Sequence, residues 1–431
     1  MADSVHVAIF TDFHPATLGG VQTAMRSLCD GLRRFGHRVT VFCAPASGST
    51  ASDDDTVVLG AAPMSMSNGL PVVLPTRANQ RVIDAAFSAR GPIDIVHALT
   101  TYGCGISGAR AARRHGIPIV QTMQSRDDTV IEKYSPSPFL AALTMRWVHG
   151  WFVRLGRQPA YDDDSRIARL AWRPLIAQAQ AADRVIVPTH HFARRLAARG
   201  VDRPIHVVSN GIDDALLDRI RGAGGTVTDT EAPLRALWCG RLSAEKRPLE
   251  AIAVARLVEE CTLDIYGSGP LADRARSAVA KADLGHRIHL HGEVAQADCL
   301  RAMGNHDLLL LTSDCDTQGM VLLEAVAMGL PVVYCDPELS ETVPDDGGVR
   351  APDPSVESLA TVLHALARDR TRLHVMREAL AAHADEPRQS RHITRILSVY
   401  AEALSVPNKP SGDRTRQARW TRKRQPGIVA S

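Results

Sequence analysis

The feature that most constrains the fold is the alternation of short apolar, β-rich runs with longer stretches of helical pattern. A first series of runs covers 5–10, 39–43, 93–97, 118–122, 184–187 and 205–208. A second series covers 234–239, 263–266, 287–291, 307–311 and 331–334. Alternation of this kind builds βαβ units, in which helices cover both faces of a parallel sheet. The sequence therefore predicts an α/β protein with two doubly wound, Rossmann-like domains.

A stretch with Gly, Thr and Asp at 221–233 separates the two series and has the composition of a linker. The chain of 431 residues also exceeds what one hydrophobic core of usual size organises. We expect Rossmann-like domains over 1–220 and 234–385, facing each other across a cleft, because open α/β sheets bind ligands beyond the carboxyl ends of their strands. A helix over 386–406 is expected to pack back on the first domain, and a basic, disordered tail over 407–431 is expected to follow.

The charge of the chain is uneven. The formal net charge is +3, but the tail from Asn408 on holds seven basic residues and one acid, which leaves the remainder near −3. A basic tail with a single tryptophan, Trp420, suits contact with an anionic lipid surface or with nucleic acid, or plain solvation. Because the body of the chain is slightly acidic and lacks a basic helical stripe, nucleic acid is not an expected partner.

Cysteine usage and hydropathy predict the compartment. The eight cysteines include no CxxC pair and mostly lie in apolar runs, which is typical of buried thiols in a reducing environment. No window of about 18 uninterrupted apolar residues indicates a spanning helix, and the first residues lack the basic flank of a signal peptide. We expect a cytoplasmic protein, with the inner face of the plasma membrane as a further location to test.

One segment of the first half, 137–156, places large apolar residues on one side of a helical wheel: Phe139, Leu140, Leu143, Trp147, Trp151 and Leu155. Arg146, His149 and Arg157 fall on the other side. Tryptophan, phenylalanine and arginine on an amphipathic helix suit an anionic membrane interface. The alternative is a helix that packs on the domain core, and the sequence leaves both interpretations open.

Two short segments have the chemistry of a diphosphate site. Gly19 and Gly20 follow the first strand and precede a helix, where backbone N–H groups can approach a phosphate, although a plain turn has the same sequence. Arg241 and Lys246 follow the strand at 234–239, and two cations there can grip phosphate oxygens. In isolation both side chains also fit an ordinary charged surface.

The segment 316–333 reads as a loop, a short apolar helix and the next strand. It leaves Glu324 as the one acid of that helix. A lone carboxylate in an apolar helix costs free energy unless it finds donors, and ribose hydroxyls are suitable donors. A salt bridge to a neighbouring arginine is the alternative.

Taken in order, these segments resemble glycosyltransferase family 4, a retaining family with the two-domain glycosyltransferase-B fold. The similarity runs from the first strand to about Asp336 and rests on the motifs at 19–22, 209–213, 240–246, 266–270 and 316–324. The resemblance implies transfer of a hexose from a nucleotide-diphosphate sugar, such as UDP-glucose or GDP-mannose, with an acceptor domain before a nucleotide-sugar domain. No metal is expected, because the cleft segments contain no Asp-x-Asp.

The resemblance also implies roles for single residues. Gly19 and Gly20 would face the diphosphate that Arg241 and Lys246 neutralise, Glu324 would hold the ribose, and Asp316 would lie near the donor sugar. The backbone groups of Met320 and Val321 would lie by the sugar and the phosphate. Gly267 and Gly269 would bend the chain near the nucleotide base. Asn210 and Gly211 are expected to shape a turn.

Two residues depart from the family pattern. The family usually has glutamate at the position of Asp316, and histidine at the position of Gln124, where it is thought to contact the donor sugar. Asp316 is one methylene shorter, and Gln124 is a neutral hydrogen-bonding side chain. We expect the shorter reach of Asp316 and the missing charge of Gln124 to alter sugar binding or proton transfer.

The acceptor is less constrained. The motifs at 19–22 and 317–320 look like those of members that glycosylate phosphatidylinositol or diacylglycerol, and this favours a membrane lipid. A small soluble acceptor, such as an aminocyclitol or a sugar, is the first alternative. A glycosyltransferase-B-like subunit that binds nucleotide without turnover is the second, motivated by Gln124 and Asp316.

Overall fold

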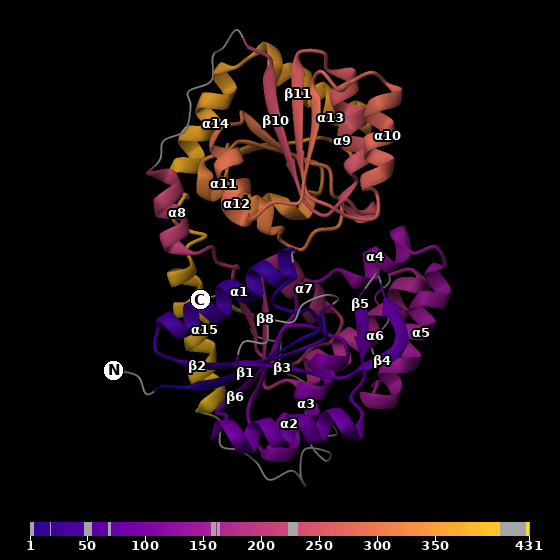
Figure 1. Cartoon of the computed structure of the whole chain (residues 1–431), viewed down its shortest axis with the longest axis vertical. Helices are drawn as coiled ribbons and strands as arrows, with labels where there is room; N and C mark the ends of the chain where they lie inside the picture. The colour runs from indigo at the N-terminus through magenta and orange to yellow at the C-terminus, as the bar shows by residue number, and fades with distance from the viewer. Residues whose placement is uncertain are drawn as a thin grey trace. The chain divides into compact units, whose positions relative to one another are not determined.

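The computed structural model describes residues 4–17, 19–46, 54–67, 70–156, 161, 164–222, 232–405 and 428–430. Two compact units make up the chain. Unit 1 contains the residues up to Ser209 and those from His392 on, and unit 2 runs from Asn210 to Arg391. Each unit contains a parallel sheet with helices on both faces, so the predicted fold class is confirmed (Figure 1).

Unit 1 is built on an eight-stranded parallel sheet with the order β16-β9-β8-β7-β6-β1-β2-β3. Its strands are β1 (His6–Thr11), β2 (Arg38–Cys43), β3 (Thr56–Val58), β6 (Ile95–Ala98), β7 (Ile119–Thr122), β8 (Arg184–Val187), β9 (Ile205–Val207) and β16 (Ile428–Ala430). A separate antiparallel hairpin comprises β4 (Ala61–Ser67) and β5 (Leu70–Val73). The sequence predicts disorder throughout the tail, but 428–430 instead pair with β9 at the sheet edge.

Helices cover both faces of this sheet. On one face, Met25, Leu28 and Leu32 of α1 (Gly20–Arg34) and the apolar side of α15 (Gln389–Leu404) pack against β1 and β2. The helices of the other face are α2 (Arg77–Arg90), α3 (Gly103–His115), α6 (Arg166–Ala181) and α7 (His190–Ala198). Two further helices, α4 (Asp127–Tyr134) and α5 (Pro138–Phe152), pack beside α6.

Unit 2 has a six-stranded parallel sheet with the order β12-β11-β10-β13-β14-β15. The strands are β10 (Leu234–Cys239), β11 (Cys261–Tyr266), β12 (Ile288–Gly292), β13 (Leu308–Leu311), β14 (Val332–Tyr334) and β15 (Gly348–Arg350). On one face lie α8 (Asp214–Arg221), α11 (Gln296–Gly304) and α12 (Met320–Met328). The other face carries α9 (Pro248–Leu257), α10 (Ala272–Lys281) and α13 (Val356–Arg368), with α14 (Thr371–Ala381) after them.

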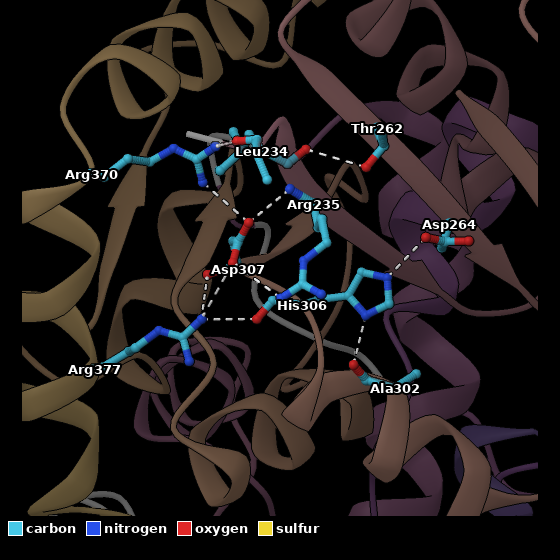
Figure 2. A network of polar contacts seen from close by, with 10 residues as sticks. Leu234, Arg235, Thr262, Asp264, Ala302, His306, Asp307, Arg370 and Arg377 are labelled. Atoms are coloured by element: carbon cyan, nitrogen blue, oxygen red, sulfur yellow. Dashed lines mark hydrogen bonds and ion pairs between the residues drawn. The ribbon is translucent and has the colours of Figure 1, made fainter. Parts of the chain in front are cut away.

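A charged cluster secures the amino-terminal edge of the second sheet. Figure 2 shows Asp307, which is 1% exposed, among Arg235, Arg370 and Arg377. Its Oδ2 accepts from the backbone N–H of Arg235 at 2.8 Å and from Arg370 at 3.1 Å, while Arg377 lies 3.8 Å from Oδ1. Because these residues belong to β10, to the start of β13 and to α14 or its approach, one carboxylate ties three segments together.

Candidate nucleotide and acceptor sites

The strand order of unit 2 reverses between β10 and β13, because β11 and β12 extend the sheet on one side and β14 and β15 on the other. In open α/β sheets, ligands bind at such a point, beyond the carboxyl ends of the strands. The loop after β10 carries Arg241 and Lys246, and the loop after β13 carries Asp316. The fold therefore brings three of the predicted residues to one place on unit 2.

The loops after β10 and β11 are bonded to each other through their backbones. The N–H of Gly240 donates to the carbonyl of Tyr266 at 3.0 Å. A Cβ on Gly267, whose φ is 139°, would lie 1.8 Å from the carbonyl oxygen of Gly240. A Cβ on Gly269, whose φ is 154°, would lie 2.6 Å from the carbonyl oxygen of Leu242. Close backbone approach thus requires both glycines, while their predicted role beside a base stays a prediction.

Lys246 and Asp316 form an ion pair across the point where the strand order reverses. The amine of Lys246 contacts Oδ1 of Asp316, and the carbonyl of Lys246 accepts from Thr312 at 2.9 Å. Burial lowers the pKa of Lys246, but the adjacent Asp316 carboxylate raises it, and the net change is an increase. The amine therefore stays protonated at neutral pH. Oδ2 of Asp316 is buried and accepts no hydrogen bond from the part of the chain that the structure describes.

Arg241 lies on the same loop as Lys246, five residues earlier, and is exposed. Its carbonyl accepts from the N–H of Ser243 at 2.8 Å, which turns the chain directly after the arginine. Lys246 itself ends a single 3₁₀ turn, Ala244–Lys246. One loop of unit 2 thus holds an exposed guanidinium and a half-buried ammonium, which is a suitable arrangement for a doubly charged anion.

Glu324 lies in the second turn of α12 and is 7% exposed. Burial raises the pKa of its carboxyl to about 7, and a hydrogen bond from Gln296 opposes the increase. Nε2 of Gln296 donates to Oε1 of Glu324 at 2.7 Å. The sequence offered an arginine as the alternative partner, and within the described ranges the structure shows the amide instead.

The start of α12 presents the backbone groups predicted for Met320 and Val321. Gly319 precedes the helix with a φ of 76°, and its carbonyl accepts from the N–H groups of Leu322 and Leu323 at 3.1 and 3.3 Å. The N–H groups of Met320 and Val321 belong to the first turn, where no earlier helical carbonyl reaches them. They form an anion-favouring helix terminus one turn before Glu324.

Two glutamines of this region carry no signal that sequence reasoning detects. Gln296 starts α11, and nothing in its local pattern indicates the contact with Glu324 twenty-eight residues later. Oε1 of Gln318 accepts from the N–H and the Nδ2 of Asn210 at 3.2 and 3.0 Å. The contact between Asn210 and Gln318 anchors the loop that carries Asp316. Asn210 therefore does more than shape its own turn.

The other predicted residues belong to unit 1. Gly19 is the N-cap of α1 with a φ of 150°, Gly20 is the first residue of that helix, and both are exposed. Gln124 is half-buried and follows β7 by two residues. All three lie just beyond carboxyl ends of strands, where the sequence predicts them. Their roles toward a donor bound on unit 2 stay predictions.

Helix α5 of unit 1 exposes its apolar side. Trp147 and Trp151 are 57% and 63% exposed, with ring centroids 4.2 Å apart, and three more apolar residues share this side: Phe139, Leu140 and Leu143. The packed side carries Ala142, Met145 and His149: Ala142 is fully buried, Met145 packs on the core of unit 1, and Nε2 of His149 lies 2.9 Å from the carbonyl oxygen of Thr101. The helix therefore packs on the domain, as the alternative holds, but it does so with these residues and leaves the tryptophan side exposed. An apolar helix side left in water is typical of an interaction surface.

Asp164 pairs with Arg199, and the guanidinium of Arg199 stacks 4.3 Å from the ring of Trp172. No helix in the described part of the chain has the length and apolar character needed to cross a membrane.

Comparisons with known proteins indicate the family of domains in each half of the chain. A protein-family model described as Glycosyltransferase Family 4 matches residues 18–216, and one described as Glycosyl transferases group 1 matches residues 233–369. The alpha-monoglucosyldiacylglycerol synthase of Streptococcus pneumoniae is 20% identical to this chain, over 79% of the chain and 74% of the synthase. The GDP-mannose-dependent alpha-mannosyltransferase of Mycobacterium tuberculosis is 26% identical, over 80% of each protein.

A solved structure shares the whole architecture. The sucrose-phosphate synthase of Thermosynechococcus elongatus aligns with a TM-score of 0.70 at 17% identity, over 93% of this chain and 99% of that protein. At this identity the likeness shows the fold alone. Both units of the chain thus have counterparts in one known two-domain protein.

Proposed function

Because the chain belongs to glycosyltransferase family 4 and has the glycosyltransferase-B fold, we propose that it transfers a hexose from a nucleotide-diphosphate sugar to an acceptor, with retention of the anomeric configuration. One observation carries the proposal. Lys246 and Asp316 meet at the strand-order reversal of unit 2, on loops that also hold Arg241 and the amino end of α12. A diphosphate is the ligand that these charges fit best.

The chemistry follows from charge. As the bond between the sugar and the diphosphate breaks, negative charge grows on the leaving group. Arg241, Lys246 and the first N–H groups of α12 stabilise that charge more in the transition state than in the ground state, and this difference lowers the barrier. In this proposal the two cations take the place of a divalent metal ion.

The donor half of the proposal has further support. The carboxylate of Glu324 lies one helical turn beyond the amino end of α12. When it is ionised, it can accept hydrogen bonds from hydroxyl groups. The mycobacterial relative is by name dependent on GDP-mannose, which supports a nucleotide-sugar donor here. A UDP or a GDP hexose is therefore the donor class that we propose.

A thermal-shift series with UDP, GDP and ADP tests the donor assignment. A ligand at about 100 times its Kd stabilises the protein by about 2.7 kcal/mol, so the right nucleotide raises the Tm measurably. Glu324→Ala should remove the shift. If none of the three nucleotides shifts the Tm of the intact chain, the donor assignment is wrong.

For the acceptor, we favour a membrane lipid reached by peripheral binding to an anionic membrane surface. The exposed tryptophans of α5 and the exposed cations Lys133 and Arg154 beside that helix support a membrane contact. Tryptophan side chains partition to the membrane interface, and nearby cations add attraction to anionic lipid. The pneumococcal relative is by name a synthase of a glycosylated diacylglycerol. The basic tail, most of which lies outside the described residues, is a second candidate for this contact.

Sedimentation with vesicles of anionic phosphatidylglycerol tests the acceptor side. Trp147→Ser with Trp151→Ser should reduce the bound fraction, whereas Val375→Ser, at a 57% exposed position of α14, should not. Removal of the tail separates its contribution from that of α5. If the intact chain fails to bind such vesicles at any salt concentration, the small soluble acceptor becomes the better interpretation. A protein that binds nucleotide but neither hydrolyses nor transfers the sugar would be the non-catalytic subunit.

A further inference from the structure

Gln296 occupies a distinctive place on the face of unit 2 that carries the donor residues. It is the first residue of α11 and is half-buried, and α11 packs against α12. Its amide points to the one acid of α12 and donates to Oε1 of Glu324 at 2.7 Å. No other hydrogen bond to this carboxylate occurs in the described residues, so Oε2 keeps its acceptor capacity.

Among the residues that the structure describes, no cation pairs with the carboxylate of Glu324. The thiol of Cys239 faces it from β10 and is hydrogen-bonded to Cys299 of α11. That contact, together with burial, holds the pKa of Cys239 well above its usual range, so the thiol is neutral. From α8, Arg221 binds the carbonyl of Ala327 at the far end of α12. From α14, Arg377 binds the carbonyl of His306.

We propose that Gln296 is a positioning residue for the donor: its amide fixes one oxygen of Glu324 so that the other is aimed at the ribose hydroxyls. The proposal rests on the donor site proposed above and adds a residue of α11 to it. An arginine at this place would occupy both oxygens with a bidentate contact. A single amide occupies one oxygen, leaves the negative charge uncompensated and keeps the carboxylate available to two hydroxyl donors.

The amide also affects the protonation of the carboxyl group. A donor on Oε1 favours the ionised form, and it opposes the burial that raises the pKa of Glu324 to about 7. Loss of the amide therefore raises the pKa of Glu324 further. The pH at which donor binding reaches half of its maximum should move upward in the same direction.

A ligand cycle tests the proposal. Affinities of UDP, GDP and ADP, each with its 2′-deoxy counterpart, are measured by calorimetry for the intact chain and for Gln296→Ala. We expect the ribonucleotide affinity to fall about tenfold, since a hydrogen bond to a charged group is lost, and the deoxynucleotide affinity to change much less. A structural defect would weaken both ligands alike, and equal losses would overturn the proposal.

Two further variants sharpen the test. Gln296→Glu places a like charge beside Glu324, so it should move the pH midpoint of binding further upward than Gln296→Ala does. Arg301→Ala, on the same helix and exposed in a pair with Asp298, should leave affinity and midpoint unchanged. An unmoved midpoint in both Gln296 variants would refute the positioning role.

The outcomes also separate this inference from the function beneath it. If the intact chain binds none of the three nucleotides, the donor site itself fails. If it binds one of them with a dependence on the 2′-hydroxyl that Glu324→Ala abolishes and Gln296→Ala preserves, the donor site stands and only the role of Gln296 is refuted.

Discussion

Each unit places a carboxylate beside the point where its strand order reverses, and the two carboxylates have opposite surroundings. The strand order of unit 1 reverses between β1 and β6, where Oδ2 of Asp12 accepts from Thr100 at 2.5 Å and Oδ1 accepts from the N–H of Cys104 at 2.9 Å. The strand order of unit 2 reverses between β10 and β13, and on the loop after β13 Asp316 faces Lys246 and keeps Oδ2 without a donor in the described ranges.

This difference separates a structural acid from one with capacity for a ligand. Both oxygens of Asp12 are used within unit 1, and the hydroxyl and N–H that bond it hold the loops after β1 and β6 together. Burial raises the pKa of Asp12, and the hydrogen bonds from Thr100 and Cys104 only oppose that increase. Both acids lie beside a reversal of strand order, and their partners decide their roles.

The largest effect is expected where a buried carboxylate of unit 2 is shared by three arginines. Asp307→Ala would leave Arg235, Arg370 and Arg377 without their shared acid, and loss of one partner from a buried ion cluster typically costs about 3–5 kcal/mol. Urea unfolding of the variant measures this loss. A cost below about 1 kcal/mol would show that partnering is not what makes an acid structural.

The next largest effect is expected for the two cations of the proposed donor site. Arg241→Ala and Lys246→Ala should each lower turnover of donor at least about 100-fold, because removal of one preorganised donor to developing charge typically costs about 3–4 kcal/mol of barrier. The rate of sugar release or transfer is the measurement. Arg276→Ala, whose guanidinium is exposed on α10 and pairs with Asp273, is the matched control. Full turnover in both site variants would contradict the assignment.

Substitution of Asp12, whose two oxygens are both bonded within unit 1, should lower the stability of the protein and leave its donor affinity unchanged. Asp12→Ala leaves the hydroxyl of Thr100 and the N–H of Cys104 without their acceptor, at a cost of about 1–3 kcal/mol in unfolding free energy. Nucleotide affinity should stay within about twofold of the original. If the variant kept normal stability but no longer bound nucleotide, Asp12 would be a ligand-binding acid and not a structural one.

The smallest effect is a pH dependence at Glu324. Its pKa of about 7 means that the carboxyl is mostly ionised at pH 8 and mostly protonated at pH 6. Because the ionised form accepts both ribose hydroxyls, donor affinity should fall about tenfold from pH 8 to pH 6. Glu324→Gln should flatten that part of the profile. An unchanged slope in this variant would assign the titration to another group.

Much of the fold can be predicted from sequence, because a buried parallel strand reads as a continuous apolar run. The runs at 184–187 and 234–239 match β8 and β10 residue for residue. The edge strands β3, β15 and β16 escape this reasoning, since each is only three residues long and has a neighbour on one side only.

The site is predictable only in part. Motif order places Lys246, Asp316 and Glu324 at the ends of known strands or on a known helix, so their location follows from the sequence. The packing contacts do not, because Gln296 reaches Glu324 and Asn210 reaches Gln318 from distant segments of the chain. Helix α5 shows a second limit. Periodicity divides its residues into two sides, but only the buried contacts of His149 reveal which side faces the protein.

The pair of Lys246 with Asp316 has a consequence for what the proposed donor site attracts. An ammonium that already has its counterion presents little net charge, so inorganic phosphate or sulfate must displace an attached carboxylate before it gains anything. A diphosphate that also engages Arg241 and the first turn of α12 repays that displacement through several contacts at once. On the proposed donor assignment, this pairing lets the protein discriminate against the small anions that surround it.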